Sequence, residues 1–362
     1  MKIAFLRSLL HFTALVLLFS ACKKDTTVAV PPAISPAVGE YVLSEGGLGG
    51  NNTKLAYYDN STTAVSGDFF LQQNPTMPAG LGDVGNDMII YGGKMYIVMN
   101  NSGRVTVLNA ANGVFIKNIS FLNGAVNKFP RYAAAARGKV YVTSWDNTVS
   151  AIDTVSLTIV KTIAVGANPE GIAASANYLY VANSGGFNPA PDSTVSLVDL
   201  NTETEIKKIK VGVNPYKVEL SATGNIYVSA YGNYTTIPAS VFVINGSTND
   251  NGSDMGSAYQ YSNVRIFNTT AYFYNNYGGV GTSKVYNTYT NSVIRNEFIT
   301  DGTVVQTPYG INIDEQNGDV YIADAGNFTS AGKVTCFNSA GVKKFSFSVA
   351  PGVNPNKILF KR

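Results

Sequence analysis

The chain has 362 residues, of which only 14% are charged, well below the roughly 25% of an average globular protein. Much of the remainder is supplied by 35 glycines, 22 tyrosines and many Asn, Thr, Ser and Val residues. This composition is typical of short strands joined by turns, and it counts against helical bundles and doubly wound α/β folds. The net charge is only +3, and no arginine cluster or basic stripe occurs. We therefore expect no nucleic-acid partner.

The chain begins with features of a secretory signal peptide over residues 1–21. Two basic residues, Lys2 and Arg7, precede an apolar stretch, and the small residues Ser20 and Ala21 end it. The stretch is too short for a transmembrane span. The single histidine, His11, lies inside this segment. The remaining chain would therefore have no histidine-dependent triad or metal site.

Cys22 follows the signal directly and predicts a lipid anchor. Residues 17–22 read Leu-Leu-Phe-Ser-Ala-Cys, which resembles a bacterial lipobox, although Phe19 stands where leucine is usual. Buried acyl chains contribute about 0.8 kcal/mol per methylene group to membrane binding. The alternative is an ordinary cleaved signal followed by an incidental cysteine. With Cys22 acylated, Cys336 would have no disulfide partner within the chain.

Residues 22–39 are expected to form a lipidated tether. Lys23-Lys24-Asp25 resembles the short charged signals that send some lipoproteins to the outer face of the outer membrane. The following residues are rich in Pro, Ala and Val and have no strand pattern, which is typical of a semi-extended linker. We expect an outer-membrane lipoprotein exposed on the cell surface.

A short pattern, in which tyrosine lies among apolar residues before a polar or glycine-rich stretch, recurs along the chain. From the second copy onward, successive tyrosines are 39 to 49 residues apart. The repeat tyrosines are Tyr41, Tyr96, Tyr141, Tyr180, Tyr227, Tyr272 and Tyr321. A period in the forties, with about four short strands in each unit, is the signature of a β-propeller.

Prolines recur in step with these tyrosines, each before a further strand. They are Pro130, Pro169, Pro215, Pro308 and Pro355. One unit, at residues 261–265, lacks its proline. Proline suits the first residue of a strand because it cannot donate a hydrogen bond to the ladder. In the unit that starts at Pro169, we expect strands at residues 170–174, 179–182, 194–198 and 206–211.

The two ends of the chain together complete one unit. The copy at Tyr41 has no preceding inner strand, whereas the segment from Asn354 to Phe360 is an inner strand with nothing after it. We therefore expect residues 40–362 to form a seven-bladed β-propeller that closes by pairing the N- and C-terminal segments in one blade. Such closure removes exposed strand edges.

Several runs resemble the YVTN repeat of the YncE-like seven-bladed propellers, and the N-terminal ones resemble a lipoprotein branch of that family. The runs are residues 140–153, 165–171, 42–46, 55–59, 82–84 and 88–90. Some members of that branch are outer-membrane surface proteins that capture corrinoids for a transporter. The resemblance covers nearly all of the chain from about residue 40 and implies a corrinoid ligand and a transporter partner. Because one fold hosts many activities, it says less about function than about fold.

Two sets of residues are expected on the face where the inner strands begin. The first set follows the repeat tyrosines and comprises Glu45, Asn100, Trp145, Asn183, Tyr231, Asn275 and Asp324. The second follows the prolines or their equivalents and comprises Asn86, Arg131, Glu170, Tyr216, Ser262, Tyr309 and Asn356. Amides, aromatic rings and a guanidinium at a concave mouth suit a large polar ligand, and all of these residues except Ser262 are predicted to bind it. The competing interpretation is that they only cap strands.

We expect binding without catalysis and no cofactor. Carboxylates such as Asp83, Asp87 and Glu45 could hold a cation at the axis, as in lactonase-like propellers, but no local motif fixes them together. The glycine-rich run at residues 46–50 is not followed by a helix pattern, so it is a turn and no phosphate loop. The alternatives are an adhesive propeller that binds glycan or protein, and a lactonase-like hydrolase.

Overall fold

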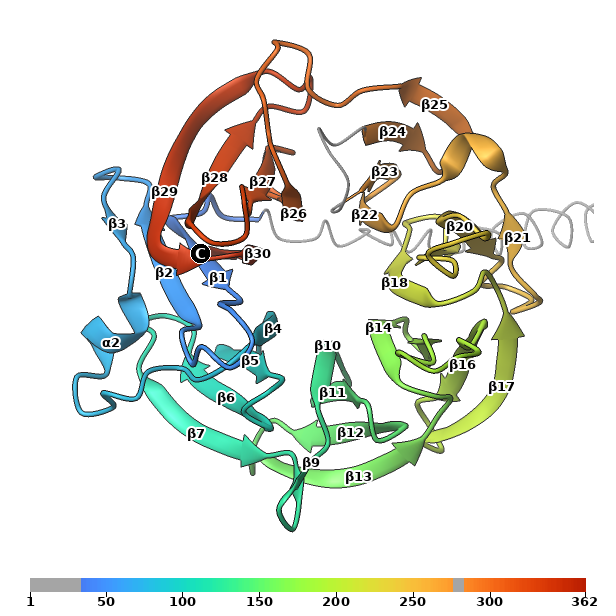
Figure 1. Ribbon diagram of the computed structural model, residues 1–362, viewed down its shortest axis with the longest axis horizontal. Helices are drawn as coiled ribbons and strands as arrows, with labels where there is room; N and C mark the ends of the chain where they lie inside the picture. The colour runs from blue at the N-terminus through green and yellow to red at the C-terminus, as the bar shows by residue number, and fades with distance from the viewer. Residues whose placement is uncertain (1–33, 276–282) are drawn as a thin grey trace, which may run out of the picture. The chain divides into compact units, whose positions relative to one another are not determined.

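The computed structural model describes residues 34–275 and 283–362, and the part from Ser35 to Arg362 is one compact unit. Within the described residues, seven four-stranded antiparallel sheets are arranged around a central axis (Figure 1). The predicted all-β, seven-bladed propeller is therefore confirmed. The signal peptide, Cys22 and most of the predicted tether lie outside the described residues.

We number the blades in chain order and give their strands from the axis outward. Blade 1 contains β30 (Pro355–Lys361), β1 (Gly39–Ser44), β2 (Lys54–Asp59) and β3 (Val65–Ser66). Blade 2 contains β4 (Gly85–Tyr91), β5 (Lys94–Met99), β6 (Arg104–Asn109) and β7 (Phe115–Ser120). Blade 3 contains β10 (Pro130–Ala136), β11 (Lys139–Ser144), β12 (Thr148–Asp153) and β13 (Thr158–Ala164).

The other four blades follow the same order. Blade 4 contains β14 (Pro169–Ala174), β15 (Tyr178–Asn183), β16 (Thr194–Asp199) and β17 (Thr204–Lys210). Blade 5 contains β18 (Pro215–Leu220), β19 (Ile226–Ala230), β20 (Ser240–Ile244) and β21 (Ser253–Asp254). Blade 6 contains β22 (Asn263–Phe267), β23 (Thr270–Tyr274), β24 (Ser283–Asn287) and β25 (Ser292–Arg295). Blade 7 contains β26 (Pro308–Ile313), β27 (Val320–Asp324), β28 (Ala331–Phe337) and β29 (Lys343–Val353).

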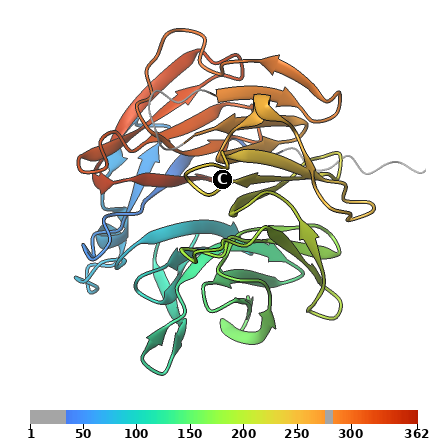
Figure 2. The same cartoon turned by 45° about the vertical axis from the view of Figure 1, so that its right-hand side comes forward.

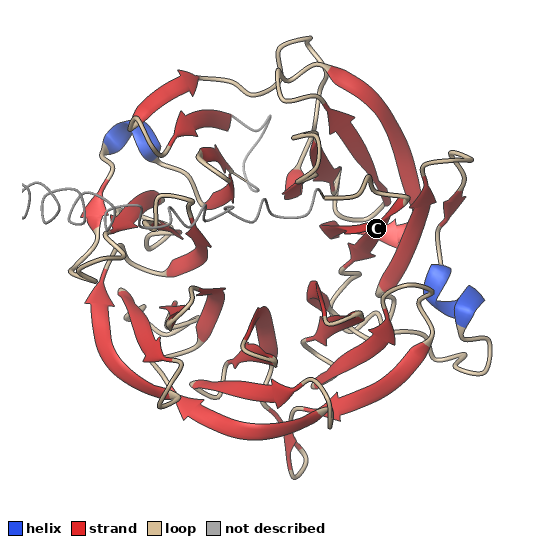
Figure 3. Cartoon of the chain, turned by 180° about the vertical axis from the view of Figure 1, so that it is seen from behind, coloured by secondary structure: helices blue, strands red, loops and turns tan. Residues whose placement is uncertain are grey.

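The remaining elements are short and lie between blades or strands. Helix α2 (Phe69–Gln73) is capped by Asp68, whose carboxylate accepts a hydrogen bond from the Leu71 amide. A 3₁₀ turn covers Ser257–Tyr259. Both are blue in Figure 3. Strands β8 (Leu122–Asn123) and β9 (Val126–Asn127) form a small hairpin before blade 3. None of these elements belongs to the repeat.

The repeat tyrosines occupy the second strand of every blade. In β11, Val140 to Ser144 are all buried, and Tyr141 is 1% exposed. A strand that is covered on both faces reads as an apolar run, whereas the outer strand of each blade faces solvent on one side. In β17 the sequence Thr-Glu-Ile-Lys-Lys-Ile-Lys buries Ile209 and exposes its lysines. A continuous apolar run thus marks the buried second strand of a blade, and charged residues between apolar ones mark its outer strand.

The two ends of the chain close the ring in blade 1. Strand β30 pairs antiparallel with β1, and Ile358 lies opposite Val42 in the register. Figure 2 shows the red C-terminal strand beside the blue N-terminal strands. The predicted closure is confirmed, and it pairs β1 on both sides, with β2 and with β30.

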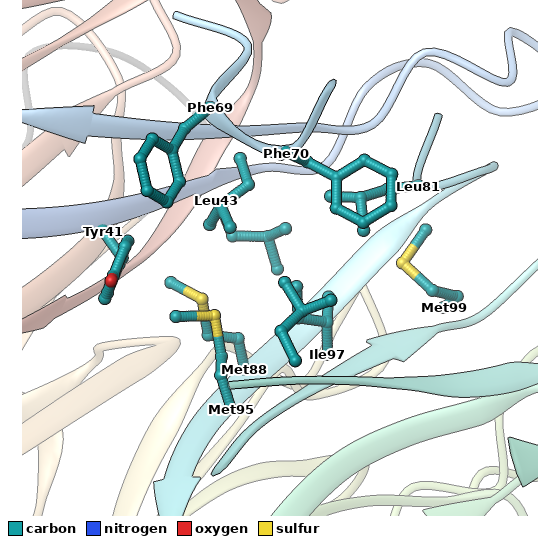
Figure 4. Close-up of a cluster of buried hydrophobic side chains, with 11 residues drawn as sticks. Tyr41, Leu43, Phe69, Phe70, Leu81, Met88, Met95, Ile97 and Met99 are labelled. Carbon is teal, nitrogen blue, oxygen red and sulfur yellow. The ribbon is translucent and has the colours of Figure 1, made fainter. Parts of the chain in front are cut away.

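Apolar side chains fill the spaces between neighbouring blades. Between blades 1 and 2, Tyr41 and Leu43 from β1 pack against Met88 from β4 and Ile97 from β5 (Figure 4). Comparable clusters lie between the other neighbouring blades in the described residues. Burying these side chains stabilises the ring by roughly 1.5–3 kcal/mol per large residue.

The inner strands begin with a register irregularity that matters for the site. In the five strands that start with proline, the pairing shifts over the first residues, for example between Pro215 and Val218 in β18. Strand β4 has the same shift after Gly85, whereas β22, which lacks the proline, has none. A bulge re-aims the side chains beside it. Consecutive residues such as Tyr216 and Lys217 therefore both face the axis.

Candidate functional site

The candidate site is a cavity at the end of the channel where the inner strands begin. It has a volume of about 870 Å³, and we call it the upper cavity. A second space of about 480 Å³, the lower cavity, lies among the inner strands. The residues that line both cavities are Asp87, Tyr132, Lys217, Tyr309, Asn356 and Lys357. The two cavities therefore meet at a ring formed by these residues, which we call the junction.

Most of the residues that the sequence places at the mouth lie together in the upper cavity. They come from blades 1, 2, 3, 4, 5 and 7 and are Glu45, Asn86, Asn100, Arg131, Trp145, Glu170, Tyr216, Tyr231, Tyr309 and Asn356. The geometry expected from the repeat thus brings together side chains that are up to about three hundred residues apart in the chain.

Three predicted residues, Asn183, Asn275 and Asp324, do not line either cavity. Asn183 donates from Nδ2 to the hydroxyls of Thr194 and Ser196, each at 2.9 Å. Asp324 accepts hydrogen bonds from the backbone amides before β26, including that of Thr307 at 2.8 Å. Both side chains hold neighbouring strand ends and turns in place through these bonds.

Asn275 has the same kind of role in blade 6. Its Oδ1 accepts a hydrogen bond from the backbone amide of Ser262 at 2.8 Å, so it caps the start of the inner strand. Ser262 likewise lies outside the lining of both cavities. No described residue of blade 6 lines the upper cavity. Most of the predicted loop after Tyr274, residues 276–282, lies outside the described residues.

A charged and aromatic cluster joins blades 3 and 4 at the cavity wall. The Nε of Arg131 donates to Glu170 Oε2 at 2.9 Å, and the indole Nε1 of Trp145 donates to Glu170 Oε1 at 3.0 Å. The guanidinium also lies 4.8 Å from the centre of the Trp145 ring. Burial alone would lower the pKa of Arg131, but the Glu170 carboxylate more than offsets it and raises that pKa.

Tyrosine rings from blades 3 and 5 form an aromatic wall. The hydroxyls of Tyr132 and Tyr216 are hydrogen-bonded at 2.5 Å, and the Tyr216 and Tyr231 rings lie 4.7 Å apart. Tyr234 continues the series at 5.8 Å from Tyr231. The ammonium of Lys217 lies 3.8 Å from the centre of the Tyr132 ring and 4.5 Å from that of Tyr216. Aromatic rings offer large rigid surfaces for stacking and for cations.

Asparagine side chains line the part of the cavity that blades 1 and 2 form, and their amide nitrogens donate to backbone carbonyls. Asn86 Nδ2 donates to the Arg131 carbonyl at 2.6 Å, and Asn100 Nδ2 donates to the Pro130 carbonyl at 3.0 Å. Asn356 Nδ2 donates to the Gly85 carbonyl at 2.8 Å. These bonds cross from one blade to the next. These asparagine side chains therefore link neighbouring blades through their Nδ2 atoms, and their Oδ1 atoms remain for other contacts.

Each of two carboxylates at the axis, Asp87 and Glu45, is bound to a partner of its own. Asp87 forms a 2.8 Å ion pair with Lys357, and Glu45 accepts a 2.6 Å hydrogen bond from the Tyr309 hydroxyl. Burial raises the pKa of Glu45 above that of an ordinary glutamate. In residues 34–275 and 283–362, no group of three or more Asp, Glu, Cys or His side chains is placed to hold a metal ion.

The rim of the upper cavity carries exposed apolar side chains. Leu48, Phe187 and Tyr234 line the cavity and are 80%, 91% and 71% exposed. The Phe187 ring meets Trp145 edge to face at 5.9 Å. Large apolar side chains gathered around a concave mouth mark surfaces that bind ligands or partners.

Sequence reasoning placed Tyr309 and Asn356 at the mouth but missed three other residues of the junction. Tyr132, Lys217 and Lys357 each stand two positions after the strand prolines, and the second predicted set was drawn only from the position after each proline. The bulges explain why both positions face the axis. Glycine fills the same position in blades 4 and 7, where a Cβ on Gly171 would meet the Tyr216 carbonyl oxygen at 2.3 Å. The only sequence signal was the proline itself, because the second residue after it could be tested along with the first.

Comparisons with known proteins agree with this fold. The chain is similar to a quinonprotein alcohol dehydrogenase-like protein from Bacteroides thetaiotaomicron, with a TM-score of 0.61 and 12% identity over 90% of this chain and 78% of that one. It is similar to the computationally designed Ika8 protein, with a TM-score of 0.60 and 12% identity over 91% and 89% of the two chains. These likenesses show the fold alone.

Hydrazine synthase from Kuenenia stuttgartiensis is also similar, with a TM-score of 0.56 and 19% identity over 68% of this chain and 74% of that one. No curated protein sequence matches the chain. In the part of the chain that the structure describes, no helix is long and apolar enough to cross a membrane. One sequence family matches over residues 38–355, almost the whole propeller. The chain therefore belongs to the family described as "Domain of unknown function (DUF5074)".

Proposed function

We propose that this propeller binds a small molecule in the upper cavity and does not convert it. The observation that carries the proposal is the chemistry of the cavity, where an aromatic wall, a buried ion pair and the Lys217 ammonium surround about 870 Å³. Ligand sites are typically concave spaces of about 300–1,000 Å³ with apolar walls and few, well-placed polar groups. The bonds that hold these groups cross blades, so the site needs no ligand to form.

The ligand class follows from the resemblance noted in the sequence. The YVTN-type repeat and the lipoprotein features are similar to those of YncE-like surface proteins that capture corrinoids, so a corrinoid is the first candidate. In this proposal Cys22 carries the lipid, the propeller faces outward from the outer membrane, and a membrane transporter takes up the ligand. The exposed apolar rim formed by Leu48, Phe187 and Tyr234 supports contact with a large ligand.

A thermal-shift screen tests the binding proposal. The chain from Cys22 onward, with Cys22→Ser, is heated with corrinoids, sugars and divalent cations. A ligand present at about 100 times its Kd stabilises the native state by about 2.7 kcal/mol, which raises the Tm by several degrees. We expect this for a corrinoid, and a much smaller shift when Trp145→Leu removes the wall between blades 3 and 4. No shift with any compound would contradict the proposal.

The same screen separates the alternatives. An adhesive protein would respond to sugars or glycans, and would respond equally when Trp145 is changed, because blade edges would make the contacts. A lactonase-like hydrolase would consume a lactone, which pH-stat titration measures as released acid. We expect no acid release above that of the buffer.

The lipid anchor has its own test. Membrane fractionation should place the wild-type chain with the outer membrane, and Cys22→Ser should release it. Protease added to intact cells should cleave the wild-type chain if it faces outward. Retention of the Cys22→Ser chain in the membrane fraction would contradict the anchor.

A further inference from the structure

We infer that the junction is a subsite for an anionic group of the ligand, a phosphate or a carboxylate, which contacts the ammonium of Lys217. This inference deepens the proposed function and rests on it. It names the chemistry that one end of the ligand must carry, whereas the aromatic wall above would hold an apolar or planar part.

The inference begins with the pairing of charges around Lys217. Four carboxylates act on it, and none of them is its ion-pair partner. Glu45 accepts a hydrogen bond from the Tyr309 hydroxyl, and the other three have cationic partners. Asp87 on β4 pairs with Lys357 on β30, Glu170 on β14 pairs with Arg131, and Glu219 on β18 pairs with Arg265, at 2.8, 2.9 and 3.1 Å. No carboxylate among the described residues forms an ion pair with Lys217. Among residues 34–275 and 283–362, carboxylates therefore attract Lys217 only from beyond ion-pairing distance.

The position of Lys217 makes that charge available to a ligand. Lys217 lines both cavities, so the ammonium lies where the two spaces meet. Its contacts are the faces of the Tyr132 and Tyr216 rings, which attract a cation without neutralising it. The hydroxyls of Tyr132 and Tyr216 are joined by one hydrogen bond, which uses one of their two protons. The second hydroxyl proton is not used in that bond. An ammonium beside a hydroxyl donor is a suitable pair for an oxyanion.

Burial gives this subsite a dependence on pH. Removal from water lowers the pKa of Lys217 to about 7, and Lys357 acts in the same direction, whereas Asp87, Glu170 and Glu219 oppose the change. Part of the population is therefore uncharged at neutral pH. An anion beside the amine raises its pKa again, so binding of the anion takes up a proton. The affinity for an anion must then fall as the pH rises above about 7, by up to about tenfold for each pH unit.

Three matched probes test the inference: 2-naphthol, 2-naphthoate and 2-naphthyl phosphate. Each presents the same aromatic part, and only the last two carry an anionic group. Calorimetry at pH 7 on the chain with Cys22→Ser should show that at least one anionic probe binds about tenfold more tightly than 2-naphthol, as for a hydrogen bond to a charged group. Comparison of the carboxylate with the phosphate identifies which oxyanion the subsite prefers.

Two substitutions and one control assign the preference to Lys217. Lys217→Gln removes the charge and should abolish the preference for the anionic probe, whereas Lys217→Arg retains the charge and should keep most of it. Lys208→Gln removes an exposed lysine on the outer strand β17 and should leave the preference unchanged. If Lys217→Gln does not fold, the wild-type chain still decides the matter through proton uptake, measured by calorimetry in two buffers with different enthalpies of ionisation.

The outcomes distinguish this inference from the proposed function. Equal affinity for all three probes, or a preference that survives in Lys217→Gln, overturns the anionic subsite and leaves the cavity as a binding site. Anion binding without proton uptake at pH 8 also overturns it. Failure of every probe to bind, together with a negative thermal-shift screen, overturns both the subsite and the proposed function.

Discussion

The guanidinium of Arg131 lies 4.8 Å from the centre of the Trp145 ring, and the same carboxylate, that of Glu170, accepts a hydrogen bond from each of these side chains. The cluster spans two blades, since Arg131 and Trp145 belong to blade 3 and Glu170 is the second residue of β14 in blade 4. It is held by contacts within the protein alone. We therefore regard it as a preformed part of the wall of the upper cavity.

Glu170→Gln is expected to destabilise the protein by about 3 kcal/mol. The amide keeps the shape of the side chain, but it leaves the Arg131 charge buried without a counterion. The Glu170 side chain is only 7% exposed, so water screens the pair poorly. Urea denaturation at pH 7 measures the effect. Glu315→Gln, at an exposed position outside the cavity lining, is the control and should change the stability by less than about 0.5 kcal/mol. Equal effects of the two variants would contradict the assignment.

Phe187→Ala is expected to weaken ligand binding while leaving the fold intact. The ring is almost fully exposed at the rim, so its loss should cost less than about 0.5 kcal/mol of stability. Its contact with a ligand should contribute about three- to tenfold in affinity. Val155→Ala removes an equally exposed apolar side chain outside the cavity lining and should not change the affinity. Titration calorimetry with the stabilising compound compares the two variants.

Glu40→Gln should remove part of the dependence of stability on pH. Burial raises the pKa of Glu40 to about 7, although hydrogen bonds from Asn60 and Tyr321 work against the rise. The folded chain therefore holds a proton that the unfolded chain releases above pH 4.5. This contribution to stability is complete below pH 4.5 and is lost as the pH rises through about 7.

The expected size of this effect is about 3 kcal/mol between pH 5 and pH 8. Denaturation curves of the wild type and of Glu40→Gln at both pH values measure it as a difference between the variants. The wild type should lose more stability than the variant over this interval. A parallel loss in the two proteins would show that Glu40 is ionised in the folded state at pH 5.

Ile358→Ala is expected to weaken the closure of the ring. Ile358 is 1% exposed and packs with Val42 and Ala56 of blade 1 and with Tyr321 of blade 7. Loss of a buried isoleucine typically costs about 2–5 kcal/mol. The control, Ile206→Ala, changes an isoleucine that is half exposed on β17 and should cost less than about 1 kcal/mol. Urea denaturation compares the two, and similar losses would contradict a closure that depends on β30.

The sequence alone was sufficient for the scaffold because the scaffold repeats. Tyr141 and its equivalents recur at a spacing that one kind of blade explains. The inner strand that starts at Pro355 has no further strands after it, so we expect it to pair with β1 and complete that blade. The rim positions of Arg131, Trp145 and Glu170 followed from the same geometry. Repetition makes each observation support the others.

The residues that break the repeat could not be placed in this way. Lys217 reaches the junction because a bulge turns two consecutive residues toward the axis, and bulges leave no mark in a pattern of alternating residues. Asn183 and Asp324 stand at rim positions in the sequence, yet each satisfies nearby backbone or side-chain groups instead of facing the cavity. Hydrogen-bond partners of this kind are set by three-dimensional neighbours, which spacing in the sequence does not give.

The most direct test of the upper cavity as the ligand site uses the fluorescence of Trp145. This residue is the chain's single tryptophan, and it lines the cavity. A compound that raises the Tm should change the tryptophan emission in a saturable manner, with the same Kd that calorimetry gives. A compound that stabilises the protein at saturation, and yet leaves the emission of Trp145 unchanged, would show that the ligand binds elsewhere.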